Sequence, residues 1–197
     1  MIRLLILNPG STSTKVAVFE DETQVFVESI SHSLEELKKY DHIMEQFPFR
    51  KDVVLKVLEK KGYWPQDFDA IVARGGILPP IRTGGYLVND DMIWQLENKP
   101  ALEHASNLGA VIADAIGSPA GIPSYIYDGV SADEMEPILK ITGLPELKRK
   151  GQGHNLNLRA AAMRYAKEHE MAFDACNLII AHLGGEELPL LCSGRGG

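Results

Sequence analysis

The segment from Leu4 to Phe19, LLILNPGSTSTKVAVF, constrains the fold and the chemistry of this chain more than any other part of its sequence. Two apolar runs typical of β-strands flank a tight turn of small hydroxyl residues, with Asn8 before the turn and Lys15 after it. Gly10 permits the backbone angles of a sharp turn. The hydroxyl and backbone N–H groups of residues 11–14 can point at phosphate oxygens, and Lys15 adds positive charge. The segment therefore predicts a hairpin that handles phosphate.

An ordinary hairpin, whose Asn-Pro-Gly-Ser turn serves backbone geometry alone, is the alternative interpretation. Such a turn does not need four consecutive hydroxyl residues and a lysine, so we favour the phosphate hairpin. Two other phosphate-binding patterns are absent from the sequence. A Walker P-loop would need GxxxxGK[ST], and a Rossmann site would need GxGxxG.

Composition excludes several classes of protein. The 197 residues, 45% of them hydrophobic, can bury the core of one full domain and part of another. The formal net charge is −7 and the longest basic run is 148–150, so we expect no nucleic-acid partner and no anionic membrane surface. The two cysteines form no CxxC site and fit a reducing cytoplasm, and the six histidines show no metal-ligand spacing. With no export signal and no apolar run of about 18 residues, we expect no membrane span.

The apolar patterns predict an α/β fold, in the order βββαβαβ, with helices packed on a mixed sheet. A capping box at Ser33 marks the start of the first helical region. The expected elements are strands at about 2–8, 14–20, 24–31, 68–73 and 123–127, a helix ending near Gly62, and helices at 90–96 and 103–116.

Arg74 is the strongest candidate for binding a further anion. It ends a predicted buried strand in VARGGILPPI, where Gly75 and Gly76 allow a close backbone approach and Pro79-Pro80 stiffens the next loop. A surface arginine after a strand is the alternative. The glycines and apolar residues around Arg74 favour the anion site.

Asp128, His154 and His182 stand at positions that are compatible with a ligand-binding site and also with a structural role. Asp128 follows the strand YIYD, where α/β sheets gather ligands, but an Asp-Gly turn is an equally good interpretation. His154 begins a helix after two glycines and can face phosphate there, although an isolated histidine is more often a cap or a surface residue. His182 ends a strand just before Gly184 and Gly185. The remaining histidines, which we expect to be structural or solvent-facing, are His32, His42, His104 and His169.

Asn8 is the candidate metal residue, because a short amide at a strand end can hold a Mg²⁺-bound water or touch a phosphate. The segment LNPGSTSTKVAVFED resembles the start of the butyrate kinases, relatives of acetate kinase in the superfamily of actin, sugar kinases and heat-shock ATPases. The resemblance extends to the RGG at Arg74 and the GHN at His154, and it ends near residue 185.

The resemblance implies a duplicated ribonuclease H-like fold and reversible phosphoryl transfer between ATP or ADP and a short-chain carboxylate, with Mg²⁺, in a cytoplasmic homo-oligomer. It implies that the carboxylate or acyl phosphate meets Arg74 and that Asp128 and His154 address the transferring group. The phosphate and nucleotide residues it implies are Ser11, Thr12, Ser13, Lys15, His182, Gly184 and Gly185. It also implies an N-terminal domain at 1–150 and, at 151–197, a linking helix and the first strand of a truncated second domain.

The tail from about residue 186 departs from the pattern that the resemblance implies. EELPLLCSGRGG stands where an alternating strand is expected, and codons for Glu186 to Arg195 exist that, read one base earlier, spell such a strand. A frameshift is our hypothesis, and unrelated codons in the gene would exclude it. We expect the strand at 177–182 to lack its hairpin partner and to leave an apolar edge.

Other functions stay open at this point. The chain can be a non-catalytic remnant or a ligand-binding fragment of the same fold, and isobutyrate, another branched acid or acetate can replace butyrate. A distant sugar kinase or an ATPase-type regulator is a further alternative. Neither an aspartate base with sugar-hydroxyl partners nor a DNA-binding helix-turn-helix is evident in the sequence.

Overall fold

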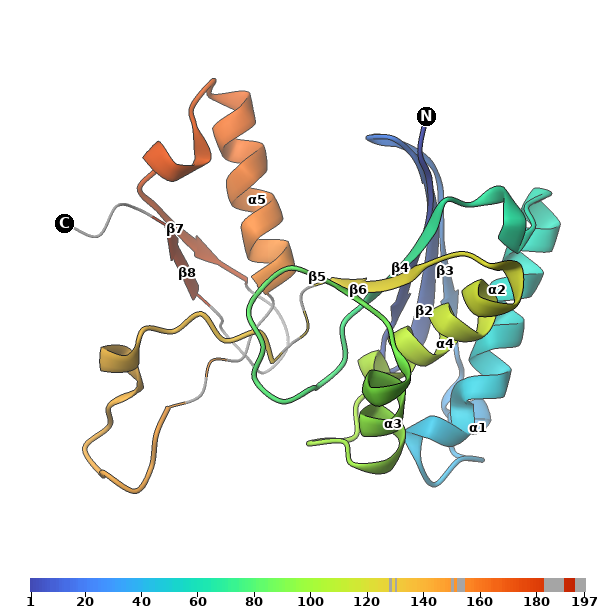
Figure 1. The fold of residues 1–197 in the computed structure, drawn as a ribbon, viewed down its shortest axis with the longest axis horizontal. Coiled ribbons are helices and arrows are strands. Elements are labelled where there is room, and N and C mark those ends of the chain that lie inside the picture. Colours follow the sequence, from blue (N-terminus) through green and yellow to red (C-terminus); the bar gives the residue numbers. More distant parts are fainter. Residues whose placement is uncertain (128, 130, 150, 152–154, 183–189, 194–197) are drawn as a thin grey trace. The chain divides into compact units, whose positions relative to one another are not determined.

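The computed structural model describes residues 1–197 except 128, 130, 150, 152–154, 183–189 and 194–197 (Figure 1). The chain forms two units, which are described separately below. Unit 1 comprises Met1–Pro79 and Gly84–Gly129, and unit 2 comprises Pro80–Thr83 and Val130–Gly197.

Unit 1 is built on a six-stranded mixed sheet with the strand order β3-β2-β1-β4-β6-β5. The first three strands form an antiparallel meander, β4 runs parallel to β1, and β6 runs parallel to β4. The short edge strand β5 is antiparallel to β6. The strands are β1 (Arg3–Pro9), β2 (Ser13–Glu20), β3 (Thr23–Ser31), β4 (Ala70–Arg74), β5 (Gly85–Leu87) and β6 (Ser124–Tyr127).

Several helix ends in unit 1 have clear capping chemistry. Ser33 and Glu36 form a capping box at the start of α1, and Asn89 caps α3 through its side chain. Gly62 ends α2 in the left-handed conformation, at φ 77°. The helices are α1 (Leu34–Leu37), α2 (Phe47–Lys61), α3 (Asp90–Asn98) and α4 (Leu108–Gly117), with 3₁₀ turns η1 (Ile43–Gln46), η2 (Pro65–Asp67), η3 (Ala105–Asn107) and η4 (Ser118–Ala120).

The core of unit 1 lies between one face of the sheet and helices α2 and α4, which Figure 1 shows beside each other along the sheet. Leu5 of β1 is paired with Val18 of β2, and both side chains are fully buried. Alternate residues along each strand therefore face the helices, and the residues between them face the opposite side of the sheet. This alternation decides which polar side chains share a face.

Unit 2 contains a helix and a two-stranded sheet that pack together. Its elements are η5 (Pro137–Lys140), α5 (Asn155–Glu168), η6 (Phe173–Ala175), β7 (Leu178–Ala181) and β8 (Leu190–Ser193). The buried side of α5 carries Leu158, Ala162 and Ala166. Cys176 is also buried, and its thiol donates to the Ala172 carbonyl at 3.4 Å.

The tail contradicts one expectation from the sequence. Strand β7 does not lack a partner, because β8 pairs with it in antiparallel register from Leu178↔Ser193 to Ala181↔Leu190. The reason is that strand pairing uses backbone groups and needs only a short run of compatible residues, which Leu190–Ser193 supplies. The predicted apolar edge is therefore wrong on this side of β7.

Candidate active site

Three of the predicted site residues lie on one face at one end of the sheet in unit 1. Asn8 and Lys15 are direct partners across β1 and β2, and the β1–β4 register pairs Leu7 with Ala73, so that Asn8 and Arg74 follow as the next residues of neighbouring strands. Leu7 and Ala73 are buried toward the helices. By alternation, Asn8, Lys15 and Arg74 face the side of the sheet opposite α2 and α4.

The turn between β1 and β2 has its carbonyl oxygens bound inside the protein. Gly10 N–H donates to the Ser13 carbonyl at 2.7 Å, and His32 N–H donates to the Thr12 carbonyl at 2.8 Å. Ser11 and Thr12 are exposed, and their own N–H groups donate to no other residue in the described part of the chain. Amides left free by such an arrangement are suited to binding an anion.

Arg50, from α2, holds the same turn from within. Its side chain has no exposed surface, which is rare for a charged residue. Burial lowers the pKa of its guanidinium, which nevertheless stays protonated. It donates to the Gly10 carbonyl at 2.7 Å, the Ser11 carbonyl at 3.1 Å, the Ser13 carbonyl at 3.1 Å, the Thr14 hydroxyl at 3.2 Å and Gln46 Oε1 at 3.0 Å.

Thr14 differs from the neighbouring hydroxyl residues of the turn. Its side chain is fully buried, and Oγ1 lies 2.8 Å from His32 Nε2. Burial, and then the charge of Arg50, lower the pKa of His32. The expectation that the hydroxyls of residues 11–14 all face phosphate is therefore wrong for Thr14, because its place in the strand alternation turns it toward the helices. Ser11, Thr12 and Ser13 remain available to a ligand.

Arg74 is half-buried at the end of β4, and burial lowers the pKa of its guanidinium. Gly76, two residues after Arg74, packs closely against Asn107, because a Cβ on Gly76 would lie 2.8 Å from Asn107 Oδ1. That oxygen accepts the N–H of Ile77 at 2.8 Å. The start of α4 packs closely against the end of β4, because a Cβ on Gly109 would lie 2.5 Å from the Arg74 carbonyl oxygen. These contacts fix the backbone that carries Arg74.

The remaining predicted residues lie in unit 2 or outside the described part of the chain. His182 follows β7, and its Nδ1 lies 2.9 Å from Asn157 Nδ2 of α5. The predicted residues that lie outside the described part of the chain are Asp128, His154, Gly184 and Gly185.

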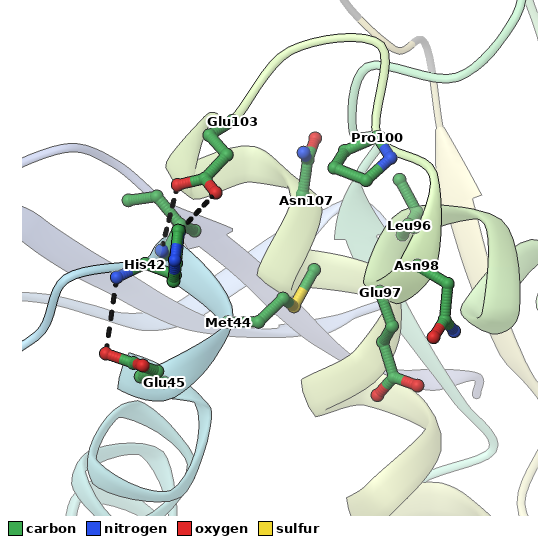
Figure 2. A pocket seen from close by; sticks show the side chains of 10 residues that line it. His42, Met44, Glu45, Leu96, Glu97, Asn98, Pro100, Glu103 and Asn107 are labelled. Atoms are coloured by element: carbon green, nitrogen blue, oxygen red, sulfur yellow. Dashed lines mark hydrogen bonds and ion pairs between the residues drawn. The ribbon is translucent and has the colours of Figure 1, made fainter.

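A cavity of about 350 Å³ in unit 1 has an acidic lining (Figure 2). Glu45, Glu97 and Glu103 contribute carboxylates, and Glu103 Oε1 accepts a hydrogen bond from His42 Nδ1 at 2.8 Å. This contact raises the pKa of His42 and lowers that of Glu103. Because three carboxylates repel phosphate, this cavity does not suit the predicted anion.

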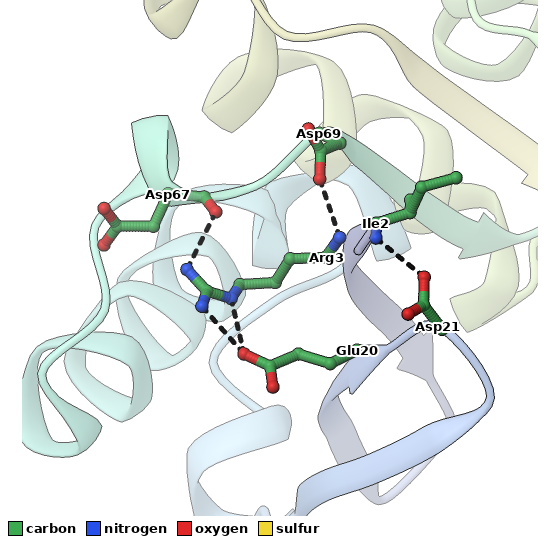
Figure 3. A network of polar contacts seen from close by, with 6 residues as sticks. All are labelled: Ile2, Arg3, Glu20, Asp21, Asp67 and Asp69. Carbon is green, nitrogen blue, oxygen red and sulfur yellow. Dashed lines mark hydrogen bonds and ion pairs between the residues drawn. The ribbon is translucent and has the colours of Figure 1, made fainter.

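A second polar network lies at the other end of β1, away from the turn (Figure 3). Arg3 forms an ion pair with Glu20 at 2.7 Å, and its backbone N–H donates to Asp69 Oδ2 at 2.7 Å. The Ile2 N–H donates to Asp21 Oδ1 at 2.8 Å. These contacts tie strand ends together, so we assign this network to stability.

Among the described residues, no group of three or more His, Cys, Asp or Glu side chains is placed to hold a metal ion. Asn8 offers one amide oxygen beside the turn. Because Mg²⁺ keeps several waters and takes few protein ligands, a Mg²⁺ site at Asn8 stays a prediction.

Sequence reasoning missed Arg50, which supports the turn from within, and it expected His32 only as a structural or solvent-facing histidine. A signal for Arg50 exists in the sequence. Arg50 precedes Val54 by four residues and Val57 by seven, so it belongs to the buried stripe of α2. A charged residue in an apolar stripe predicts a buried polar partner.

Comparisons with known structures define the class of fold. The acetate kinase of Porphyromonas gingivalis matches 98% of this chain and 55% of that chain, with a TM-score of 0.67 and 17% identity. A propionate kinase from Francisella tularensis matches 93% of this chain and 52% of that one, with a TM-score of 0.61 and 18% identity. The chain thus has the ribonuclease H-like α/β fold of the acetate and propionate kinases.

Comparisons with curated sequences identify the family. Butyrate kinase 2 of Clostridium acetobutylicum is 51% identical over 183 residues, which make up 93% of this chain and 51% of that protein. Butyrate kinase 1 of the same organism is 44% identical over 185 residues, or 94% of this chain and 52% of that protein. No family model matches the chain. The chain belongs to the butyrate kinase family and corresponds to the N-terminal part of these proteins, spanning about half of their length. None of its described helices is long and apolar enough to cross a membrane.

Proposed function

We propose that this chain carries the phosphate hairpin and the carboxylate-binding arginine of a butyrate kinase, which transfers phosphate reversibly between ATP and a short-chain carboxylate. The observation that carries the proposal is the turn at residues 10–13, whose carbonyls are bound within the protein while the amides of the exposed residues Ser11 and Thr12 donate to no other described residue. Arg74 lies at the same end of the sheet, at the end of the neighbouring strand β4. Two anions would then meet next to each other, which phosphoryl transfer requires.

The chemistry needs positioning and positive charge more than it needs a base. A carboxylate is already ionised at neutral pH, so it can attack the γ-phosphorus directly. The new bond joins a carboxylate oxygen to phosphorus, and the bond that breaks joins phosphorus to the bridging oxygen, which leaves on ADP. In the proposal, Arg74 holds the carboxylate, Lys15 and the turn hold phosphoryl oxygens, and Asp128 and His154 address the transferring group. His182, Gly184 and Gly185 belong to the nucleotide side.

The proposal includes Mg²⁺, which when bound would neutralise charge on the phosphate oxygens. Asn8 would hold the ion through its amide oxygen or through a bound water. We also propose a cytoplasmic location, where ATP is available, and a homo-oligomeric assembly of the whole protein. Isobutyrate, other branched acids and acetate are alternative substrates of the same chemistry.

Calorimetric titration with butyryl phosphate tests the proposal on this chain. We expect binding that Arg74→Ala weakens by about 10- to 100-fold, because a charge-assisted, two-pronged contact contributes roughly 1.5–3 kcal/mol. Arg74→Lys should recover part of the loss, since a lysine keeps the charge and loses the planar fork. The matched control is Arg164→Ala, an exposed arginine on α5 of unit 2. Equal losses in both alanine variants, or no binding by the unchanged protein, would reject the site.

A further inference from the structure

The charge of Arg50 has no carboxylate partner among the described residues. The five acceptors of its guanidinium are three backbone carbonyls, one hydroxyl and one amide oxygen, all of them neutral. Burial is the single cause that lowers its pKa, with no acidic side chain acting in the other direction. A full positive charge is therefore buried at this point, which is costly unless something outside compensates it.

The solvent side of the same turn offers a place for such compensation. Arg50 and the His32 N–H together bind the carbonyls of residues 10–13, so the negative ends of these peptide dipoles point into the protein. Ser11 and Thr12 are exposed, and their amides donate to no other described residue. The buried charge and the free N–H groups favour the same ligand, an anion rich in oxygen.

We propose that Arg50 is the positioning residue of the phosphate hairpin. Its hydrogen bonds keep the turn carbonyls inward and the amides outward, and its charge lacks a counter-ion until a phosphoryl group binds on the other side of the turn. Arg50 does not touch the ligand and acts through the backbone of residues 10–13. This inference rests on the proposed function of the hairpin and adds the residue that sets its affinity.

An NMR titration of the full chain with inorganic phosphate tests the role of Arg50. In ¹H–¹⁵N spectra of the unchanged protein, the amides of residues 10–15 should shift in a saturable way. Arg50→Met keeps most of the side-chain volume and removes the charge and all donors. It should give a dispersed spectrum and bind phosphate at least about tenfold more weakly, as expected when a unit charge at close range is lost from a partly dry site. Arg50→Lys keeps the charge without the fork, so its affinity should lie between the two.

The matched control is Arg3→Met, because Arg3 is also ion-paired and hydrogen-bonded but lies at the other end of β1. It should lower stability and leave phosphate affinity unchanged. Equal affinity in the unchanged protein and a folded Arg50→Met would overturn the role of Arg50 and leave the hairpin as an anion site. No response of residues 10–15 in the unchanged protein would overturn both. If Arg50→Met does not fold, Arg50→Lys decides, and affinity equal to that of the unchanged protein refutes the inference.

Discussion

Replacing Gly109 with alanine should destabilise the protein, although the same change favours most helices. Gly109 lies in the first turn of α4, where alanine would contribute about 1 kcal/mol through helix propensity. Its new Cβ would lie 2.5 Å from the Arg74 carbonyl oxygen and 3.2 Å from Ala73 Cβ. The Arg74 oxygen belongs to the backbone and the Ala73 Cβ is attached directly to it, so neither atom can rotate away, and the clash can be relieved only by moving α4 away from β4. Overpacking of this kind costs about 3 kcal/mol at the upper end of its usual range.

The balance is a loss of about 2 kcal/mol, or a fall of about 4–8 °C in Tm for a chain of this size. Circular dichroism melting measures it, and Gly143→Ala is the control because a Cβ there meets nothing within 4 Å. The control should stay within about 0.5 kcal/mol of the unchanged protein. Because the displaced carbonyl belongs to Arg74, butyryl phosphate binding should weaken along with Tm. A Gly109→Ala protein that melts at or above the temperature of the unchanged one would refute the packing argument.

Three further predictions concern activity, pH and the tail. The isolated chain should show at most about 10⁻² to 10⁻³ of the turnover of a full-length butyrate kinase in a butyrate, ATP and Mg²⁺ assay, because losing even one charge-stabilising donor lowers the rate to that extent. Comparable turnover, with contaminating kinases excluded, would contradict this prediction. His32 has a lowered pKa in the folded protein, so its contribution to stability is present above about pH 6.5 and is lost as the pH falls. Between pH 7.5 and 5.5, the Tm of His32→Gln should therefore fall less than that of the unchanged protein. Parallel curves of Tm against pH for the two proteins would argue against this role of His32. Deleting residues 190–197 removes the partner of β7 and should increase aggregation in size-exclusion chromatography. An unchanged elution profile would show that β8 does not protect the edge of β7.

Local sequence patterns predict the position of most strands and helices of unit 1. The opening strands were expected at about 2–8, 14–20 and 24–31, and they occur at Arg3–Pro9, Ser13–Glu20 and Thr23–Ser31. The first helical region ends at Gly62 as expected, because a left-handed C-cap favours glycine. These features depend on alternation and capping, which act over a few residues and can be read directly from the sequence.

Features that depend on distant partners were not predictable in the same way. Strand β5 is short and contains Gly85, and its pairing with β6 arises from the sheet and not from local propensity. The helix expected at 103–116 begins instead with the turn η3, because His104 Nδ1 accepts the Ser106 N–H at 3.1 Å. At the candidate site, Asn8 and Lys15 follow from the hairpin pattern, but the groups that bind the buried Thr14 hydroxyl, His32 and Arg50, lie more than fifteen residues away along the chain.

The position of Arg50 in the chain also bears on the order in which the phosphate hairpin matures. Strands β1 and β2 are adjacent in sequence, so they can pair as soon as both have left the ribosome, with little loop-closure entropy to overcome. The guanidinium that binds the carbonyls of the turn arrives only with α2, and it reaches them only after that helix docks on the sheet. A nascent chain ending before residue 47 would therefore have the strands of the hairpin without its anion-binding shape, and we expect phosphate to begin to favour the folded state only after the whole of α2 has been synthesised.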